Sequence, residues 1–161
     1  MTKSLAPDIA QALSERATSE MYASNFYRSA SGWARNAGLS NTAKYFANEA
    51  DQEQVHLALL LDYLADWNVP TIPALPPPCD LPNTLGEILQ YAYDMEYQLG
   101  EDYNTTRLAI QQMDLFTYDF LEFYTKTQTE SIIEYNDLIK KHSASTMDLW
   151  FDLEVMDAEA K

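Results

Sequence analysis

Prolines divide this chain into two long stretches and one short connector. Six of the fifteen residues from Asn68 to Pro82 are proline, and the remaining proline is Pro7. Proline fixes φ and removes a backbone donor, so the connector cannot be helical, but it is stiff and can span a long distance. The proline-free stretches on either side can each form long helices. The connector can then carry the chain from one end of those helices to the other.

The first stretch has the pattern of a helical hairpin. We predict one helix from about Pro7 to Asn36 and a break at Gly38, which suits a left-handed C-terminal cap. Ser40 or Asn41 would cap a second helix that ends at about Trp67. A connection this short between two long helices implies that they are antiparallel.

The second stretch repeats this arrangement. Thr84, with Glu87 three residues later, resembles a capping box at the start of a third helix that reaches about Met113. Asp114 is expected to cap a fourth helix, from about Leu115 to Lys141. A short fifth helix, about Met147 to Ala158, is rich in apolar residues and is expected to pack against the bundle or against other subunits.

Two hairpins joined by one long crossover make an all-α four-helix bundle. We expect a single domain over 1–161, with the bundle over about 7–141. The formal charge of −15 argues against nucleic acid or an anionic membrane as partner. The sequence shows no signal peptide and no apolar run long enough to span a bilayer, so a cytoplasmic protein is expected. The single cysteine, Cys79, excludes an internal disulfide and is expected to be a free thiol without a role.

The second helix carries a Glu-x-x-His motif. Glu53 and His56 lie three residues apart, and Glu49 lies four residues before Glu53, so all three share one helical face. Neither acid has a Lys or Arg three or four residues away. Acids on the packed side of a helix need a protein counter-charge or a metal. The motif alone is weak evidence, because most helical Glu and His residues are simply solvated.

Acids on two other helices could face the same point. Glu20 lies among apolar residues of the first helix, although Arg16, four residues earlier, could pair with it. Glu96 on the third helix has no basic residue in local reach. Its alternative interpretation is a mid-bundle acid bonded to tyrosine hydroxyls.

The fourth helix carries Gln128 and Glu130, and Lys126 could pair with Glu130. Each long helix thus contributes an oxygen ligand near its middle, and the second also contributes an imidazole. Such a mixed set suits iron or manganese, whereas oxygen-only cages suit magnesium or calcium. Clustered acids also repel one another, so without metal some of them are expected to have raised pKa values.

In these residues and their spacing, the chain resembles ferritin, the non-haem iron-storage family, over nearly its whole length. The order and spacing of the segments and the long crossover all agree. The matching segments are Glu20–Tyr27, Ser31–Trp33, Gly38–Leu39, Glu49–His56, Leu61–Leu64, Glu96, and Phe120–Tyr124 leading to Gln128.

The resemblance implies ligand roles at a di-iron site that oxidises Fe²⁺ to Fe³⁺. Glu20, Glu53 and His56 match the ligands of the first iron, and Glu53 also bridges to the second. Glu96 matches the other ligand of the second iron.

The resemblance also implies roles around that site. Gln128 matches the nearby glutamine of the fourth helix. Tyr27 matches a tyrosine that can hydrogen-bond a ligand or give up an electron, although a core tyrosine is the alternative. Glu49 and Glu130 resemble the acids of a third iron site in some prokaryotic and algal ferritins.

Three positions depart from the family pattern. Gln52 replaces a second acid before Glu53, and Thr127 and Ser131 replace acids on the fourth helix. A complete third site is therefore in question, and Glu49 with Glu130 could form only a weak or transit site. Ser131 also breaks the second Glu-x-x-His of bacterioferritin, which disfavours that branch and its haem. The first helix lacks a histidine, which disfavours the mini-ferritin pattern, and His142 is expected to be exposed and away from the site.

The resemblance implies a cage of 24 subunits in which Fe²⁺ is oxidised by O₂ or H₂O₂ and stored as mineral. The alternative on the same bundle is a di-iron peroxidase or oxygenase without iron storage. Such enzymes usually have a second histidine ligand and an open substrate pocket, and the sequence indicates neither. A metal-free interaction bundle is a third interpretation, against which the unpaired Glu53 and Glu96 argue.

Overall fold

The computed structural model describes residues 2–159, which are helical or irregular, with no β-strand among them. The predicted all-α class is confirmed. The elements in chain order are α1 (Pro7–Asn36), α2 (Ser40–Asp66), α3 (Leu85–Ile110), α4 (Leu115–Phe120), α5 (Glu122–Ala144), α6 (Asp148–Phe151), the π-helical η1 (Asp152–Met156) and α7 (Asp157–Glu159).

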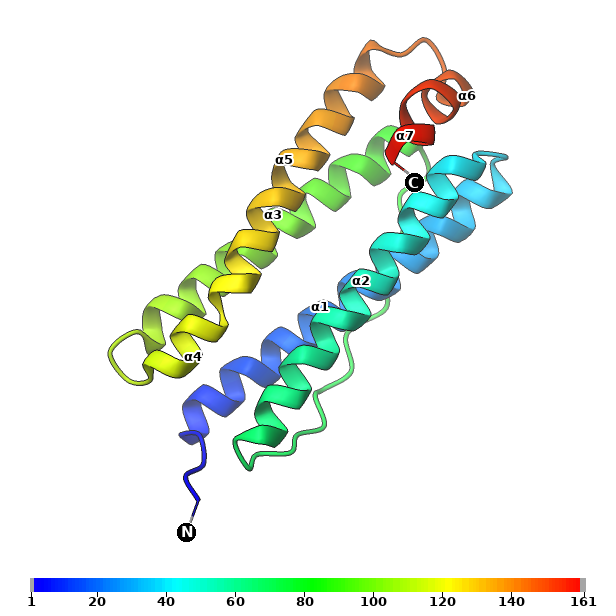
Figure 1. Cartoon of the computed structure of the whole chain (residues 1–161). Helices are drawn as coiled ribbons and strands as arrows, with labels where there is room; N and C mark the ends of the chain where they lie inside the picture. The colour runs from blue at the N-terminus through cyan, green and yellow to red at the C-terminus, as the bar shows by residue number, and fades with distance from the viewer. Residues whose placement is uncertain (1, 160–161) are drawn as a thin grey trace.

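Two antiparallel hairpins form the bundle. α1 packs along α2, and α3 packs along α5 (Figure 1). The non-helical segment between α2 and α3 runs back along the first hairpin, so α3 starts near the turn between α1 and α2 (Figure 1). The predicted bundle with one long crossover is confirmed. Cys79, in this crossover, keeps a free, half-buried thiol.

Three predicted helix ends are confirmed. Gly38 adopts a positive φ of 79° after α1, which is the conformation that glycine tolerates best. The Thr84 hydroxyl accepts a hydrogen bond from the backbone N–H of Glu87 at 3.3 Å and donates to the Glu87 carboxylate at 2.9 Å. Asp114 accepts from the backbone N–H groups of Phe116 and Thr117 at the start of α4.

The predicted cap of α2 is wrong. Neither Ser40 nor Asn41 caps this helix, which follows Leu39 without a local side-chain cap. Asp152, from the C-terminal segment, accepts from the backbone N–H of Thr42 at 2.7 Å and from that of Asn41 at 3.3 Å. A buried carboxylate from a distant part of the chain therefore satisfies the free donors at this helix start.

The fourth and fifth helices differ in detail from the prediction. A turn at Leu121 interrupts the fourth helix, which divides into α4 and α5, and α5 continues to Ala144. The fifth helix consists of α6, η1 and α7. His142 is half-buried and not exposed as expected, because its Nε2 lies 2.8 Å from Asp148 and its ring packs edge-on against Phe151.

The bundle has two apolar clusters and a polar layer between them. One cluster lies towards the turn between α1 and α2 and includes the C-terminal Phe151 and Met156. The other lies towards the N-terminus and the turn before α4. On each long helix, one or two of the buried polar residues fall between members of the two clusters and form this layer. These polar residues are Glu20, Glu53, His56, Glu96 and Gln128.

Candidate metal centre

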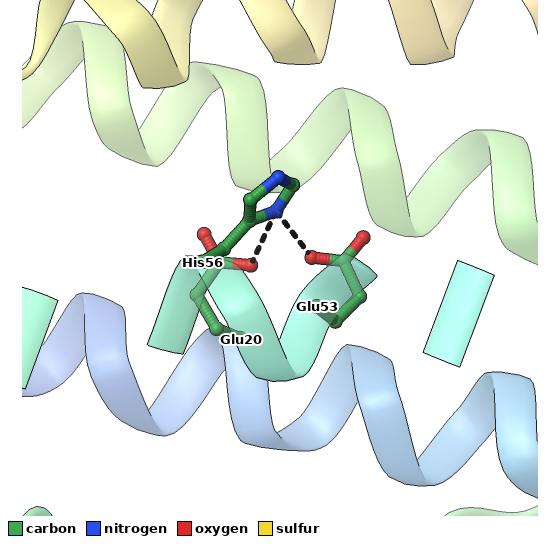
Figure 2. Close-up of side chains that lie close together, drawn as sticks. All are labelled: Glu20, Glu53 and His56. Carbon is green, nitrogen blue, oxygen red and sulfur yellow. Dashed lines mark hydrogen bonds and ion pairs between the residues drawn. The ribbon is translucent and has the colours of Figure 1, made fainter. Parts of the chain in front are cut away.

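Three ligand-type side chains converge at mid-height of the first hairpin. Glu20 comes from α1, and Glu53 and His56 come from α2. One ligand atom of each lies within 4.8 Å of the others, and all three residues are buried. His56 Nδ1 lies 2.8 Å from Glu53 Oε2 and 3.7 Å from Glu20 Oε2, as Figure 2 shows.

The close packing of α1 against α2 positions this group. The Ser24 hydroxyl donates to the carbonyl of Ala50 at 2.9 Å, and the Ser31 hydroxyl donates to that of Ala43 at 2.7 Å. These small side chains let the two helices approach closely and bring Glu20 level with the i, i+3 pair of α2.

Glu96 joins the layer from the second hairpin. It is fully buried, accepts a hydrogen bond from the Tyr27 hydroxyl, and accepts another from Gln128 Nε2 at 2.6 Å. The tyrosine bond of the alternative interpretation of Glu96 is therefore present, and it is compatible with a ligand role for the same carboxylate. Glu96 is outside the compact group of Glu20, Glu53 and His56. Its carboxylate is nonetheless close enough for the charge of Glu20 to act on it.

Two further tyrosines, to which the sequence assigned no role at the site, belong to this layer. The Tyr103 hydroxyl donates to Glu20, and the Tyr124 hydroxyl donates to the backbone carbonyl of His56 at 2.8 Å. Their rings stack at 4.7 Å between centroids. Helical spacing was an available signal, because Tyr103 lies seven residues after Glu96 and Tyr124 lies four before Gln128.

Arg16 does not neutralise this layer. It forms an ion pair with Asp102 at 3.0 Å, so the pairing with Glu20 that we considered from sequence is absent from residues 2–159. Within the same residues Glu20 Oε2 is buried and accepts no hydrogen bond. Burying a carboxylate oxygen that accepts no hydrogen bond costs free energy, unless the oxygen binds a proton or a cation.

Burial and mutual repulsion raise the pKa values of the acids. Burial raises the pKa of Glu53 well above its ordinary value, and the nearby charges of Glu20 and Glu96 raise it further. Burial also raises the pKa of Glu96 to about 7, even though the hydrogen bonds from Tyr27 and Gln128 oppose the shift. The layer therefore holds protons near neutral pH that a bound cation would displace.

Glu49 and Glu130 lie outside this layer, in a pocket of about 450 Å³ between α2 and α5. Glu130 is exposed, and Lys126 pairs with Glu122 at 3.2 Å and not with Glu130. Burial and the charge of Glu134 raise the pKa of Glu49 to about 8. We refer to this site as the acidic pocket, and its acids are Glu49, Asp51, Glu130, Glu134 and Glu159.

The family is established by comparison with known proteins. A family model described as a ferritin-like domain matches residues 10–144. A bacterial non-heme ferritin from Escherichia coli O6:H1 is 28% identical over 141 residues, 86% of each chain. Ferritin BfrB from Mycolicibacterium smegmatis is 27% identical over 130 residues, 80% of this chain and 72% of that protein.

Solved structures have the same fold. An open-pore ferritin from the archaeon Archaeoglobus fulgidus superimposes with a TM-score of 0.87 at 20% identity, covering 95% of this chain and 98% of that one. An engineered closed form of the Archaeoglobus fulgidus ferritin gives a TM-score of 0.89 at 19% identity, covering 98% and 97%. The conserved bundle and the family match over most of its length together show that this chain belongs to the ferritin family, as a non-haem ferritin of the prokaryotic type.

Proposed function

We propose that this chain oxidises Fe²⁺ with dioxygen or hydrogen peroxide at a two-iron site inside each subunit, as part of the general iron-storage role of its family. The observation that carries the proposal is the buried convergence of Glu20, Glu53 and His56, with one carboxylate oxygen lacking a donor in the described chain. Hard carboxylate oxygens with a single imidazole suit Fe²⁺. Fe²⁺ is the substrate here.

Each residue has a separate role in this proposal. Glu20 and His56 bind one Fe²⁺, Glu53 bridges both ions, and Glu96 binds the second. Holding two ions side by side lets the oxidant take two electrons in one encounter. The low dielectric of the layer strengthens each ligand contact once the ions have displaced the protons.

Tyr27 and Gln128 orient Glu96. Both donate to its carboxylate, and Gln128 Nε2 also lies 3.2 Å from the Glu96 backbone carbonyl. Hydrogen bonds of this kind to a ligand carboxylate fix its position and tune its affinity for metal. Tyr27 is also close enough to give an electron to an oxidant bound at the centre.

We further propose that Glu49 and Glu130 bind a third Fe²⁺ weakly in the acidic pocket. Gln52, Thr127 and Ser131, which also line it, offer neutral oxygens where a tight site would have carboxylates. The pocket is open to solvent, which screens its charges. This supports a transit site for Fe²⁺ and not a site of permanent binding.

The proposal includes assembly into a cage of 24 subunits. Apolar side chains on the C-terminal segment are exposed in the single chain: Met147, Leu149, Trp150 and Leu153. Such a patch on a short terminal element supports its use as a contact between subunits. Within residues 2–159, no helix is both long and apolar enough to cross a membrane.

Two measurements test the proposal. A crystal soaked in Fe²⁺ is expected to show two ions among Glu20, Glu53, His56 and Glu96, located by anomalous scattering at the iron edge. Iron bound elsewhere, with this layer empty, would refute the two-iron site. Size-exclusion chromatography with light scattering should give a particle near half a megadalton, from 24 copies of 18.4 kDa. A monomer or dimer would favour the di-iron enzyme over the storage cage.

A further inference from the structure

A groove between α1, α3 and the crossover is separate from the metal centre. It encloses about 540 Å³, and none of Glu20, Glu53, His56 and Glu96 lines it. Sites for small organic molecules have volumes of about 300–1,000 Å³. We refer to this site as the crossover groove. Its apolar lining consists of Tyr22, Pro76, Pro77, Tyr91, Met95 and Leu99.

Hydrogen bonds inside the chain hold the walls of the groove in position. The Thr18 hydroxyl donates to the carbonyl of Ala74 in the crossover at 2.7 Å, and the Cys79 thiol donates to the carbonyl of Tyr22 at 3.8 Å. The hydroxyls of Tyr22 and Tyr91 pair with each other and so join α1 to α3. The groove is therefore formed before any ligand binds, which lowers the entropic cost of binding.

Both charged residues that line the groove are acids, and only one of them lacks a counter-charge. Asp102 is paired, because Arg16 Nη1 lies 3.0 Å from its Oδ2. Asp94 accepts a hydrogen bond from the neutral Gln90 at 3.0 Å and has no cationic partner within residues 2–159. The two acids are eight residues apart on α3, which is about 12 Å along the helix. One net negative charge therefore remains, at the Asp94 end of the groove.

A second acceptor lies beside Asp94. Gln98 follows it by four residues and shares its face of α3. The amide nitrogen of Gln98 donates to Asp102 at 3.0 Å, which leaves its amide oxygen as an acceptor. A protonated amine has three N–H donors, so one amine can bind the Asp94 carboxylate and the Gln98 oxygen together. An anion would instead be repelled by Asp94 and by the formal charge of −15 on the chain.

The apolar lining requires a ligand with a body of the same character. The hydroxyls of Tyr22 and Tyr91 satisfy each other, so these rings need no hydrogen bond from a ligand. The Tyr91 ring also stacks on Phe26 at 4.8 Å, which fixes its orientation. Aromatic side chains bind other rings and attract cations. A ligand body of one or two aromatic rings suits this lining and this volume.

We propose that the crossover groove binds a small organic cation with a body of one or two aromatic rings and a single protonated amine. The rings lie against the apolar lining, and the amine binds Asp94 and Gln98. The pairing of Asp102 with Arg16 leaves no free charge for a second amine. This inference does not depend on iron, because the groove shares no residue with the group of Glu20, Glu53 and His56.

Three probes with the same rings and different charges test the proposal. Naphthylmethylamine is a cation at neutral pH, naphthalenemethanol is uncharged, and naphthoate is an anion. Isothermal titration calorimetry of the wild-type protein at low salt measures the dissociation constant of each. We expect the amine to bind about fivefold more tightly than the alcohol, because an exposed ion pair contributes about this much, and naphthoate to bind most weakly. Added salt should weaken binding of the amine and not of the alcohol.

One pair of variants tests the charge. Asp94→Asn removes the charge at the groove, whereas Glu101→Gln removes a charge from an exposed position of α3 outside it. Asp94→Asn should lower the affinity for the amine to that for the alcohol, and it should leave the affinity for the alcohol unchanged. Glu101→Gln should bind all three probes as wild type does.

A second pair of variants tests the location. Ser19 lines the groove, and its hydroxyl donates to the carbonyl of Glu15 on its own helix at 3.1 Å, so replacing it removes no contact between helices. Ser19→Trp should fill the groove and weaken binding of the amine and the alcohol at least about tenfold, because their rings lose their apolar contacts. Ser29→Trp places the same ring on an exposed position of α1 outside the groove and should match wild type. The melting temperature of each variant reports on its fold.

Four results would overturn the proposal. The first is equal affinity of the wild type for the amine and the alcohol, and the second is an equal loss in Asp94→Asn and Glu101→Gln, which would assign the attraction to the whole acidic surface. The third is wild-type affinity in a folded Ser19→Trp, which would locate the probes elsewhere. The fourth is a crystal structure in which a neighbouring subunit fills the groove. If Ser19→Trp does not fold, the charge variants decide the question. Fe²⁺ oxidation should be unchanged in Asp94→Asn, so these results and a failure of the proposed function are distinguishable.

Discussion

The metal centre and the acidic pocket both gather carboxylates between helices, but they differ in their access to water. Glu53 in the centre is 3% exposed, and apolar clusters cover the layer towards both ends of the bundle. Glu130 in the pocket is exposed. Glu53 is therefore a buried acid and Glu130 an ordinary surface acid, while Glu49, half-buried at the inner side of the pocket, lies between these extremes.

This difference predicts different affinities for cations. In the buried layer the effective dielectric is low, so a divalent ion gains strong attraction and removes the repulsion among the acids. In the pocket, solvent and salt screen the same charges. If only the number of acids mattered, the pocket would bind cations more tightly than the centre. Burial of the centre reverses this order of affinity.

Removing the bridging ligand should have the largest effect. We expect Glu53→Ala to slow Fe²⁺ oxidation by at least about 100-fold, because it removes a ligand from both ions and even groups that only support a ligand are worth 10- to 100-fold. Stopped-flow absorbance of Fe³⁺ formation measures this rate. Glu101→Ala, an exposed acid on α3, is the matched control. A wild-type rate for Glu53→Ala would show that the buried layer is not the site of oxidation.

The second prediction concerns pH and the metal-free protein. Glu96 has an ordinary pKa of 4.5 that is raised to about 7 in the fold. A raised folded-state pKa gives stability that is present below pH 4.5 and is lost as pH rises through 7. The melting temperature of metal-free protein should therefore fall between pH 5 and pH 8. Saturating Zn²⁺ should reduce this fall in melting temperature, because the bound cation neutralises the carboxylates that have lost their protons.

Two variants sharpen that test. Glu96→Gln carries no titrating carboxyl, so its melting temperature should depend less on pH than that of wild type. Glu101→Gln, at an exposed position of the same helix, should keep the wild-type dependence. If both variants have the wild-type slope, the pH dependence comes from acids other than Glu96, among which Glu49 and Glu53 also have raised pKa values.

The smallest effect is expected in the pocket. Glu130→Gln should change the initial rate of Fe²⁺ oxidation by less than about threefold, because an exposed acid contributes little to a screened site. Glu49→Gln should have a larger effect than Glu130→Gln, since Glu49 is the more buried of the two. Stopped-flow rates at limiting Fe²⁺ compare them. A Glu130→Gln loss as large as that of Glu53→Ala would contradict the ranking by burial.

Most of the fold could be predicted because its signals are local. Helix starts at Thr84 and Asp114 depend on side chains that reach backbone groups two or three residues away. The break at Gly38 depends on the conformational freedom of one residue. The cap of α2 could not be predicted, because Asp152 lies 110 residues away from Thr42 along the chain.

In the candidate site, too, local features could be predicted from the sequence and contacts between helices could not. Helical spacing placed Glu53 and His56 on one face without any knowledge of the other helices. The partner of Arg16 could not be decided that way, because Glu20 was in local reach while the actual partner, Asp102, lies on another helix. The roles of the predicted ligands remain predictions until metal is observed.

The amino-acid sequence by itself determined the approximate lengths of the first three helices, the stiff crossover and the acids available on each helix, because these depend on neighbours within one or two turns. Only the tertiary structure decided which of those acids are buried, and that the rings of Tyr103 and Tyr124 stack beside them. The reason is physical: the pKa of an acid and the contact of two rings depend on distance in space and on exclusion of water. Both depend on how the two hairpins pack against each other.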